Sequence, residues 1–217
     1  MPGVVLRYVV PIFTRLYRTD SSSFSRKFSN NMAKKTAILL IADGSEEMEA
    51  VITADVLRRA GVDLTIASIT GNECVKCSRD IKICADAKFE DAVKTKYDVV
   101  ILPGGLGGSN AFSASAEVGA LLKEQEKENR IIAAICAAPT ALKAHDIAKG
   151  KQLTSYPAMQ DQLEADYKYL QDRVVIDGNL ITSRGPATAF DFGLAIVQKL
   201  LDKDTADKVS KAMLCTN

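Results

Sequence analysis

Residues 130–142, Arg-Ile-Ile-Ala-Ala-Ile-Cys-Ala-Ala-Pro-Thr-Ala-Leu, join a short apolar run to an alanine-rich segment with proline near its start. This pattern predicts a buried β-strand, a sharp turn and a helix. Cys136 then stands at the carboxyl end of the strand and at the positive end of the helix, where open α/β folds place chemistry and where a thiolate is stabilised. The alternative is a cysteine that only fills the core, because free cysteine is among the most buried residue types.

The sequence on both sides of this stretch alternates between strands and helices. Apolar runs of strand length occupy Thr36–Ala42, Val62–Ile69, Tyr97–Leu102 and Gln152–Ser155. Helical patterns occupy Glu46–Ala60, Phe89–Lys94, Glu117–Glu128, Ala187–Leu201 and Thr205–Met213. Continuous apolar strands separated by helices form a largely parallel sheet that is covered on both faces. We therefore predict one α/β domain, a flavodoxin-like three-layer sandwich with a mostly parallel central sheet.

Two segments are predicted to depart from the parallel alternation. Residues Gly71–Lys88 have the pattern of a short antiparallel excursion. The dipeptide Asp177-Gly178 lies between Arg173–Ile176 and Leu180–Thr182, which is typical of a β-hairpin.

The N-terminal 31 residues differ from the rest of the 217-residue chain. They hold five basic residues against Asp20 alone, a net charge of +4, so that residues 32–217 carry −3 of the total of +1. Arginines interrupt their apolar residues and serines are frequent, as in a mitochondrial transit peptide. The alternative is an extension that carries no address, and Met32 could itself start a complete domain with a cytosolic location. A mildly acidic body gives no signature of nucleic-acid binding, and the broken apolar run is too short to span a membrane.

The five cysteines do not predict a disulfide framework, because their number is odd and no secretory signal precedes them. Cys74 and Cys77 form a lone C-x-x-C pair in a loop or hairpin, and we do not expect them to pair. Zinc would need a second such pair, and the single histidine with Cys84 and Cys215 does not supply it. No metal site is predicted.

The acid/base partner of Cys136 is expected to be a carboxylate. His145, the single histidine, would lie about 13 Å further along a helix, too far for a Cys-His pair. Glu46 and Glu47 are explained by the dipole at a helix start. Glu49 shares a helix face with Ile52, Val56 and Ala60, so it should point inward, where burial raises the pKa of a carboxyl group toward a useful range.

Two further motifs are predicted to end at the same edge of the sheet. Glycines 104 and 105, after Pro103, leave backbone N–H groups open to an oxyanion or a carbonyl oxygen, although two glycines often form only a turn. Arg184, at the end of a later strand, adds a cation to this rim.

Together these motifs resemble the ThiJ/PfpI superfamily over about residues 35–211. The residues that carry the resemblance are Glu46-Glu47-Met48-Glu49, Cys77-Ser78-Arg79-Asp80, Leu102-Pro103-Gly104-Gly105, Ala133-Ala134-Ile135-Cys136-Ala137 with Pro139-Thr140, and Ser183-Arg184-Gly185-Pro186. The resemblance implies that residues 32–217 form a homodimeric domain of this type without a bound cofactor. It places the nucleophile at Cys136, its partner at Glu49, substrate-binding residues at Gly104, Gly105, Ala137, Arg79 and Arg184, and further oxidation-prone cysteines at Cys77 and Cys84. One departure is Tyr156, which stands where the family often has a histidine.

Two functions of different classes follow. The first is a cysteine-dependent glyoxalase or protein deglycase, which acts on methylglyoxal, glyoxal or their adducts, needs neither glutathione nor metal, and protects against oxidative stress. The second is a non-catalytic redox sensor or redox-regulated chaperone that works through oxidation of Cys136. The expected location is the cytoplasm and the mitochondrion, with the nucleus as a further site.

Overall fold

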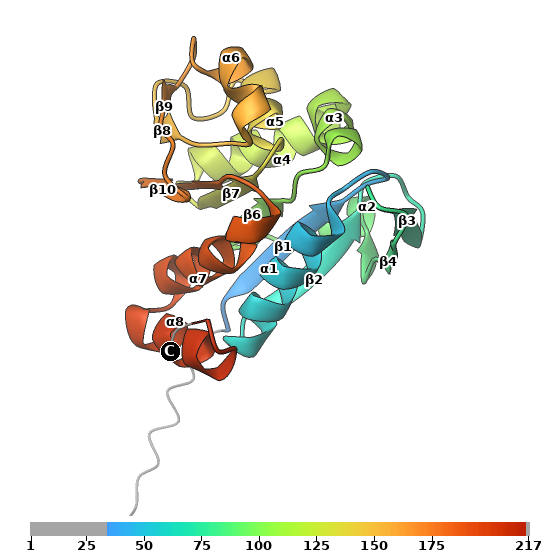
Figure 1. Cartoon of the computed structure of the whole chain (residues 1–217). Helices are drawn as coiled ribbons and strands as arrows, with labels where there is room; N and C mark the ends of the chain where they lie inside the picture. Colours follow the sequence, from blue (N-terminus) through green and yellow to red (C-terminus); the bar gives the residue numbers. More distant parts are fainter. Residues whose placement is uncertain (1–33, 216–217) are drawn as a thin grey trace, which may run out of the picture. The chain divides into compact units, whose positions relative to one another are not determined.

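A seven-stranded β-sheet forms the centre of the computed structural model, which describes residues 34–215. Its strand order is β10-β11-β7-β6-β1-β2-β5, and only β10 runs antiparallel to its neighbour. Figure 1 labels β10, β7, β6, β1 and β2 of this sheet. The strands are β1 (Thr36–Ile41), β2 (Asp63–Ser68), β5 (Ala87–Lys88), β6 (Val99–Leu102), β7 (Ile131–Ile135), β10 (Val174–Asp177) and β11 (Leu180–Ser183). The mostly parallel sheet and the hairpin around Asp177-Gly178 are therefore confirmed.

Strand β1 shows why the domain has three layers. Its side chains alternate between two hydrophobic cores, with Ala37, Leu39 and Ile41 on one face of the sheet and Ile38 and Leu40 on the other. All five are fully buried. Side chains of a strand point alternately to opposite faces, so a strand that is apolar at five consecutive positions, 37–41, needs a layer of helices on each side.

The helices supply these two layers. On one face, α1 (Glu47–Arg59) and α7 (Ala189–Leu200) lie side by side (Figure 1), with α8 (Lys203–Ala212) packed against α7. The other core includes residues of α2 (Phe89–Ala92), α3 (Leu106–Ala114), α4 (Ala116–Lys127), α5 (Pro139–Ala144) and α6 (Gln160–Leu163). Phe192 and Phe112 are the largest fully buried side chains of the respective cores. The predicted three-layer sandwich is confirmed.

Two small ribbons lie outside the central sheet. The predicted antiparallel excursion consists of β3 (Cys74–Lys76) and β4 (Lys82–Cys84). The segment Gln152–Ser155 was expected to be a strand of the main sheet, which is wrong. Only Gln152–Leu153 (β8) is extended, and it pairs with β9 (Lys168–Tyr169) in a sheet of two strands.

Helix α3 is a second departure from the sequence prediction, which gave a loop after Pro103. Two glycines lie inside α3 because the helix packs tightly against the loop that follows β1. A Cβ atom at Gly107 would lie 2.9 Å from the Asp43 carbonyl oxygen, and one at Gly108 would lie 2.4 Å from Ser45 Oγ. Here glycine permits close packing rather than a turn.

The N-terminal extension of residues 1–31 lies outside the described residues, so its role stays a prediction. Across residues 34–215, no helix combines the length and the apolar character needed to cross a membrane.

Candidate active site

Cys136 occupies the sharp turn between β7 and α5, as predicted. Its backbone has φ 64°, in the left-handed region that side chains other than glycine rarely adopt. Two backbone hydrogen bonds hold this conformation: the Cys136 N–H donates to the Ser183 carbonyl at 2.9 Å, and the Tyr156 N–H donates to the Cys136 carbonyl at 2.8 Å. These two bonds hold the turn to the segments at Ser183 and Tyr156 and so fix the direction of the Cys136 side chain.

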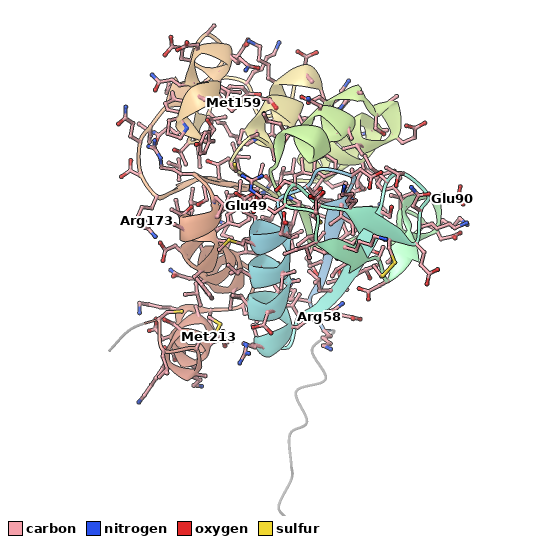
Figure 2. The ribbon with its side chains drawn as sticks, turned by 45° about the vertical axis from the view of Figure 1, so that its right-hand side comes forward. Glu49, Arg58, Glu90, Met159, Arg173 and Met213 are labelled. Atoms are coloured by element: carbon pink, nitrogen blue, oxygen red, sulfur yellow. A yellow bond between two sulfur atoms is a disulfide. The ribbon has the colours of Figure 1, made fainter. Side chains whose placement is uncertain are left out.

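Glu49 is fully buried at the N-terminal end of α1 (Figure 2). Its Oε2 accepts a hydrogen bond of 2.7 Å from the Gly104 N–H, while Oε1 has no partner among the described residues. Burial raises the pKa of Glu49 to about 7, and the nearby Glu46 carboxylate acts in the same direction. The predicted inward carboxyl group with a raised pKa is therefore present in the structure, and it exchanges a proton near neutral pH.

The thiol of Cys136 has the opposite pKa shift from the one expected at a helix start. Burial, followed by the charge of the Glu49 carboxylate, raises the pKa of Cys136 to about 12, against the smaller opposing effect of the Gly105 and Ala137 N–H groups. The expectation of a low-pKa thiol is wrong while Glu49 is ionised. The two groups titrate as a pair: a protonated Glu49 removes the repulsion that disfavours the thiolate.

Gly104, which follows the end of β6, lies in close contact with Cys136 and Glu49. A Cβ atom at Gly104 would lie 2.5 Å from Cys136 Cβ and 2.8 Å from Glu49 Oε2. Gly105 has φ 79°, and a Cβ there would lie 2.2 Å from the Gly44 carbonyl oxygen. The sequence analysis expected the N–H groups of Gly104 and Gly105 to face a substrate. The Gly104 N–H donates to Glu49 instead, so the N–H groups of Gly105 and Ala137 are the ones that can donate to an oxyanion.

A cavity of about 700 Å³ opens over the thiol. Its lining is mainly apolar on one side and polar around Arg79. The lining residues are Gly44, Glu46, Ser78, Arg79, Gly105, Leu106, Gly107, Cys136, Ala137, Tyr156, Ala158, Met159 and Pro186. Such a cavity can seat a small carbonyl compound with one anionic group.

The polar rim of the cavity is held by a network that the sequence analysis missed. Ser78 Oγ donates to Glu46 Oε2 at 2.6 Å and lies 2.8 Å from Glu47 Oε2, and the Arg79 N–H donates to Glu47 Oε1 at 2.9 Å. Burial opposes ionisation of Glu47, yet these hydrogen bonds lower its pKa. The acids at the helix start therefore do more than complement its dipole: they fasten the β3–β4 turn to α1.

The two predicted arginines differ in position. Arg79 lines the cavity with Cys136. Arg184 is not among its lining residues, because its Nη1 donates to the Gln171 carbonyl at 2.7 Å and the guanidinium is turned away. The expectation of a cation from Arg184 at this rim is therefore wrong. Tyr156 lines the cavity with its side chain half-exposed.

The other cysteines also depart from the sequence-based expectations. Cys74 and Cys84 form a single disulfide bond across the β3–β4 ribbon, a pairing that the sequence analysis did not predict, and the expectation of Cys84 as an oxidation-prone free thiol is wrong. Cys77 is 4% exposed, and burial with the Glu47 carboxylate raises its pKa to about 11. This environment protects Cys77 against the oxidation expected for it.

His145 ends helix α5, and its Nε2 lies 2.8 Å from the Phe112 carbonyl oxygen in the last turn of α3. His145 thus contacts a carbonyl at the end of a neighbouring helix, and it does not line the cavity at Cys136. No three His, Cys, Asp or Glu side chains within residues 34–215 are grouped so that they could hold a metal ion.

Comparison with known proteins places this geometry in a family. The model of the DJ-1/PfpI family matches residues 35–199, which is most of the chain. The chain belongs to the DJ-1/PfpI family. Protein dj-1beta of Drosophila melanogaster is 53% identical over 181 residues, which cover 83% of this chain and 97% of that protein. The crystal structure of Drosophila melanogaster DJ-1beta matches with a TM-score of 0.83 and covers 85% of this chain and all of that one.

Two other DJ-1 relatives bear on function. A Caenorhabditis elegans protein named glutathione-independent glyoxalase DJR-1.2 is 38% identical over 182 residues, which are 83% of this chain and 97% of that protein. The solved structure of oxidized Toxoplasma gondii DJ-1 is 34% identical with a TM-score of 0.80, and the match covers 83% of this chain and 98% of that one. The predicted superfamily and the flavodoxin-like α/β fold are confirmed by these matches.

Proposed function

We propose that this protein is a glutathione-independent glyoxalase and deglycase with Cys136 as nucleophile. The observation that carries the proposal is the pairing of Cys136, which lines the cavity on a left-handed elbow, with the buried carboxyl group of Glu49 directly behind it, whose pKa is about 7. A group with this pKa can give and take a proton at neutral pH. The name of the C. elegans relative supports the same chemistry.

The first step is addition of Cys136 Sγ to the aldehyde carbon of methylglyoxal. Ionised Glu49 takes up the thiol proton as the C–S bond forms and passes it to the aldehyde oxygen, which becomes the hydroxyl group of a hemithioacetal, so that Glu49 is ionised again. The N–H groups of Gly105 and Ala137, which reach the sulfur position, stabilise the negative charge that develops on this oxygen.

The second step moves a hydrogen between the two oxygen-bearing carbons. Glu49 removes the proton from the former aldehyde carbon and returns it to the neighbouring carbon, while the hydroxyl proton moves to the oxygen of that neighbouring carbon, so that the hemithioacetal becomes a 2-hydroxyacyl thioester with no net oxidation. Water then cleaves the thioester, and lactate leaves with regeneration of the thiol. Glycated amines and thiols are the same carbonyl compound in conjugated form, so the proposal includes their repair.

Lactate formation from methylglyoxal without glutathione tests the proposal. Cys136→Ala should abolish it, and Cys215→Ala should not, since Cys215 is exposed and does not line the cavity. A Cys136→Ala protein that is as active as the wild type would refute the assignment of the nucleophile.

A redox sensor or redox-regulated chaperone remains the second candidate. It is favoured by the partly exposed free thiol of Cys136 beside a carboxyl group that can donate a hydrogen bond when protonated. The Toxoplasma gondii relative was solved in an oxidized form. Peptide mass mapping after mild peroxide should find two added oxygens at Cys136 first; earlier oxidation of Cys215 would count against this role.

Assembly and location are part of the proposal. A homodimer is supported by exposed Met48 and Val51 on α1 and by Ile81 and Phe190, apolar side chains that a partner would cover. Sedimentation of the wild type and of a Val51→Glu variant tests this.

We further propose that residues 1–31 direct part of the protein to the mitochondrion, with the remainder in the cytoplasm and nucleus. Import of a fluorescent fusion with and without these residues provides the test.

A further inference from the structure

The cysteine pair Cys74 and Cys84 lies outside the reaction proposed above. The two residues stand directly opposite each other in the β3–β4 ribbon. The backbone hydrogen bonds on either side join Ala85 N–H to the Glu73 carbonyl and Cys77 N–H to the Ile81 carbonyl. Cys74 and Cys84 are thus a non-hydrogen-bonded pair, the position at which cross-strand side chains approach most closely. The structure joins them by a disulfide bond, and Figure 2 draws such a bond in yellow.

The surroundings of this disulfide favour reversible chemistry. Both cysteines are exposed, unlike Cys77, so soluble thiols and disulfides can reach them. Lys76 and Lys82 form the next non-hydrogen-bonded pair and project from the same face of the ribbon. Lys76 Nζ is paired with Asp80 Oδ1 at 2.6 Å, so Lys82 is the cation of the two that has no ion-pair partner among the described residues. Exposed disulfides are the ones that thiols reduce readily, and a nearby cation stabilises an attacking thiolate.

The ribbon that the disulfide closes is also the element that carries Ser78 and Arg79 to the cavity. Three hydrogen bonds, each 2.8 Å long, join the ribbon to the loop after β1. Two involve Lys76: its carbonyl accepts from the Gly44 N–H, and its N–H donates to Asp43 Oδ1. The third runs from the Ser78 N–H to the Ser45 carbonyl. Arg79 N–H adds its bond to Glu47. The disulfide joins the two strands at the end of the ribbon opposite the turn at residues 78–80. Backbone motion at this end would be transmitted along the ribbon to Ser78 and Arg79 at the polar rim of the cavity.

We propose that Cys74 and Cys84 are a reversible dithiol–disulfide pair whose oxidation clamps the ribbon that holds Ser78 and Arg79 at the cavity. The oxidant is a low-molecular-weight disulfide of the glutathione type. One cysteine thiolate attacks it and releases one glutathione thiol; the second cysteine then attacks the mixed disulfide and releases the other. The protein loses two electrons, the oxidant gains two, and the two thiol protons end on the released glutathione. The step does not depend on turnover of aldehydes.

The first measurement is thiol trapping in the wild-type protein. Samples equilibrated with glutathione and glutathione disulfide at a series of ratios are quenched with an alkylating agent and mapped by peptide mass. Cys74 and Cys84 should become paired together as the ratio turns oxidising, whereas Cys77 should stay a thiol at every ratio. Pairing of Cys74 with Cys77, alkylation of both residues at all ratios, or a disulfide-linked dimer through Cys84 on a non-reducing gel would each overturn the proposal.

The second measurement is amide hydrogen exchange of the oxidised and reduced wild-type protein, which needs no variant. Reduction should speed exchange of the Lys76, Ser78 and Arg79 amides at least about fivefold while the β1 amides stay unchanged. Cys74→Ser should abolish the response to the glutathione ratio, and the matched control Cys215→Ser should keep it. Equal exchange in the two redox states would overturn the clamp.

Discussion

The buried carboxyl group of Glu49 should make the protein less stable as the pH rises, and Glu49→Gln should remove this dependence. The unfolded chain releases the proton near pH 4.5, the usual value for glutamate, whereas the folded protein keeps it up to a pKa of about 7. Between these values the folded state binds more protons than the unfolded state, so stability falls with rising pH. Below pH 4.5 both states are protonated, and above pH 7 the full penalty is present.

The size of the effect follows from the difference between the two pKa values. At about 1.4 kcal/mol for each pH unit the penalty approaches roughly 3 kcal/mol, of which about 2.5 kcal/mol develops between pH 5 and pH 8. For a domain of this size that corresponds to a shift in Tm of about 5–10 °C. Glutamine keeps an oxygen for the Gly104 N–H and has no charge, so any packing difference is the same at every pH.

The assay is thermal unfolding of the wild type and of Glu49→Gln at pH 5 and pH 8. The Tm of the variant relative to the wild type should rise between the two pH values. Glu47→Gln is the matched control: the pKa of Glu47 is lowered from its usual 4.5, so its contribution to stability is already nearly complete at pH 5 and the relative Tm of this variant should stay nearly constant between the two pH values. A relative Tm of Glu49→Gln that does not change with pH would refute the assignment of a raised pKa to this residue.

Four further substitutions have defined outcomes. Gly104→Ala places a methyl group 2.5 Å from Cys136 Cβ, so lactate production should fall at least about a hundredfold, with slower alkylation of Cys136 as the structural readout. Arg79→Ala should raise the KM for methylglyoxal about tenfold, whereas Arg184→Ala, whose guanidinium points away from the cavity, should change it less than about twofold. Phe192→Ala should lower the free energy of unfolding by about 3–5 kcal/mol in urea titrations, since this side chain is fully buried.

Much of the fold could be predicted because its signals are local. Strand β1 is apolar at every position after Thr36, and the Asp177-Gly178 turn and the elbow at Cys136 each follow from a few adjacent residues. Helix α3 was missed for a physical reason: Gly107 and Gly108 usually mark a loop, and their close approach to Asp43 and Ser45 is visible only in three dimensions.

The positions of the main site residues could be predicted from the sequence, but the pKa of Cys136 could not. The inward direction of Glu49 follows from helical periodicity. The high pKa of Cys136 depends on burial by segments distant in the sequence and on the Glu49 charge, which no local pattern contains. The pairing of Cys74 with Cys84 depends on strand register: placing a three-residue turn at Ser78-Arg79-Asp80 would have set the two cysteines opposite each other.

The left-handed backbone of Cys136 changes the effect that a substitution at this position has on the stability of the fold. A cysteine held at φ 64° carries a penalty of roughly 1–2 kcal/mol that glycine would not. A change from cysteine to glycine at this position would therefore relieve the backbone, but it would also remove the contacts of Cys136 with the core cluster on the α1 and α7 face of the sheet. The two effects on stability oppose each other, so this substitution removes the thiol with a smaller loss of stability than truncation of a core side chain usually causes.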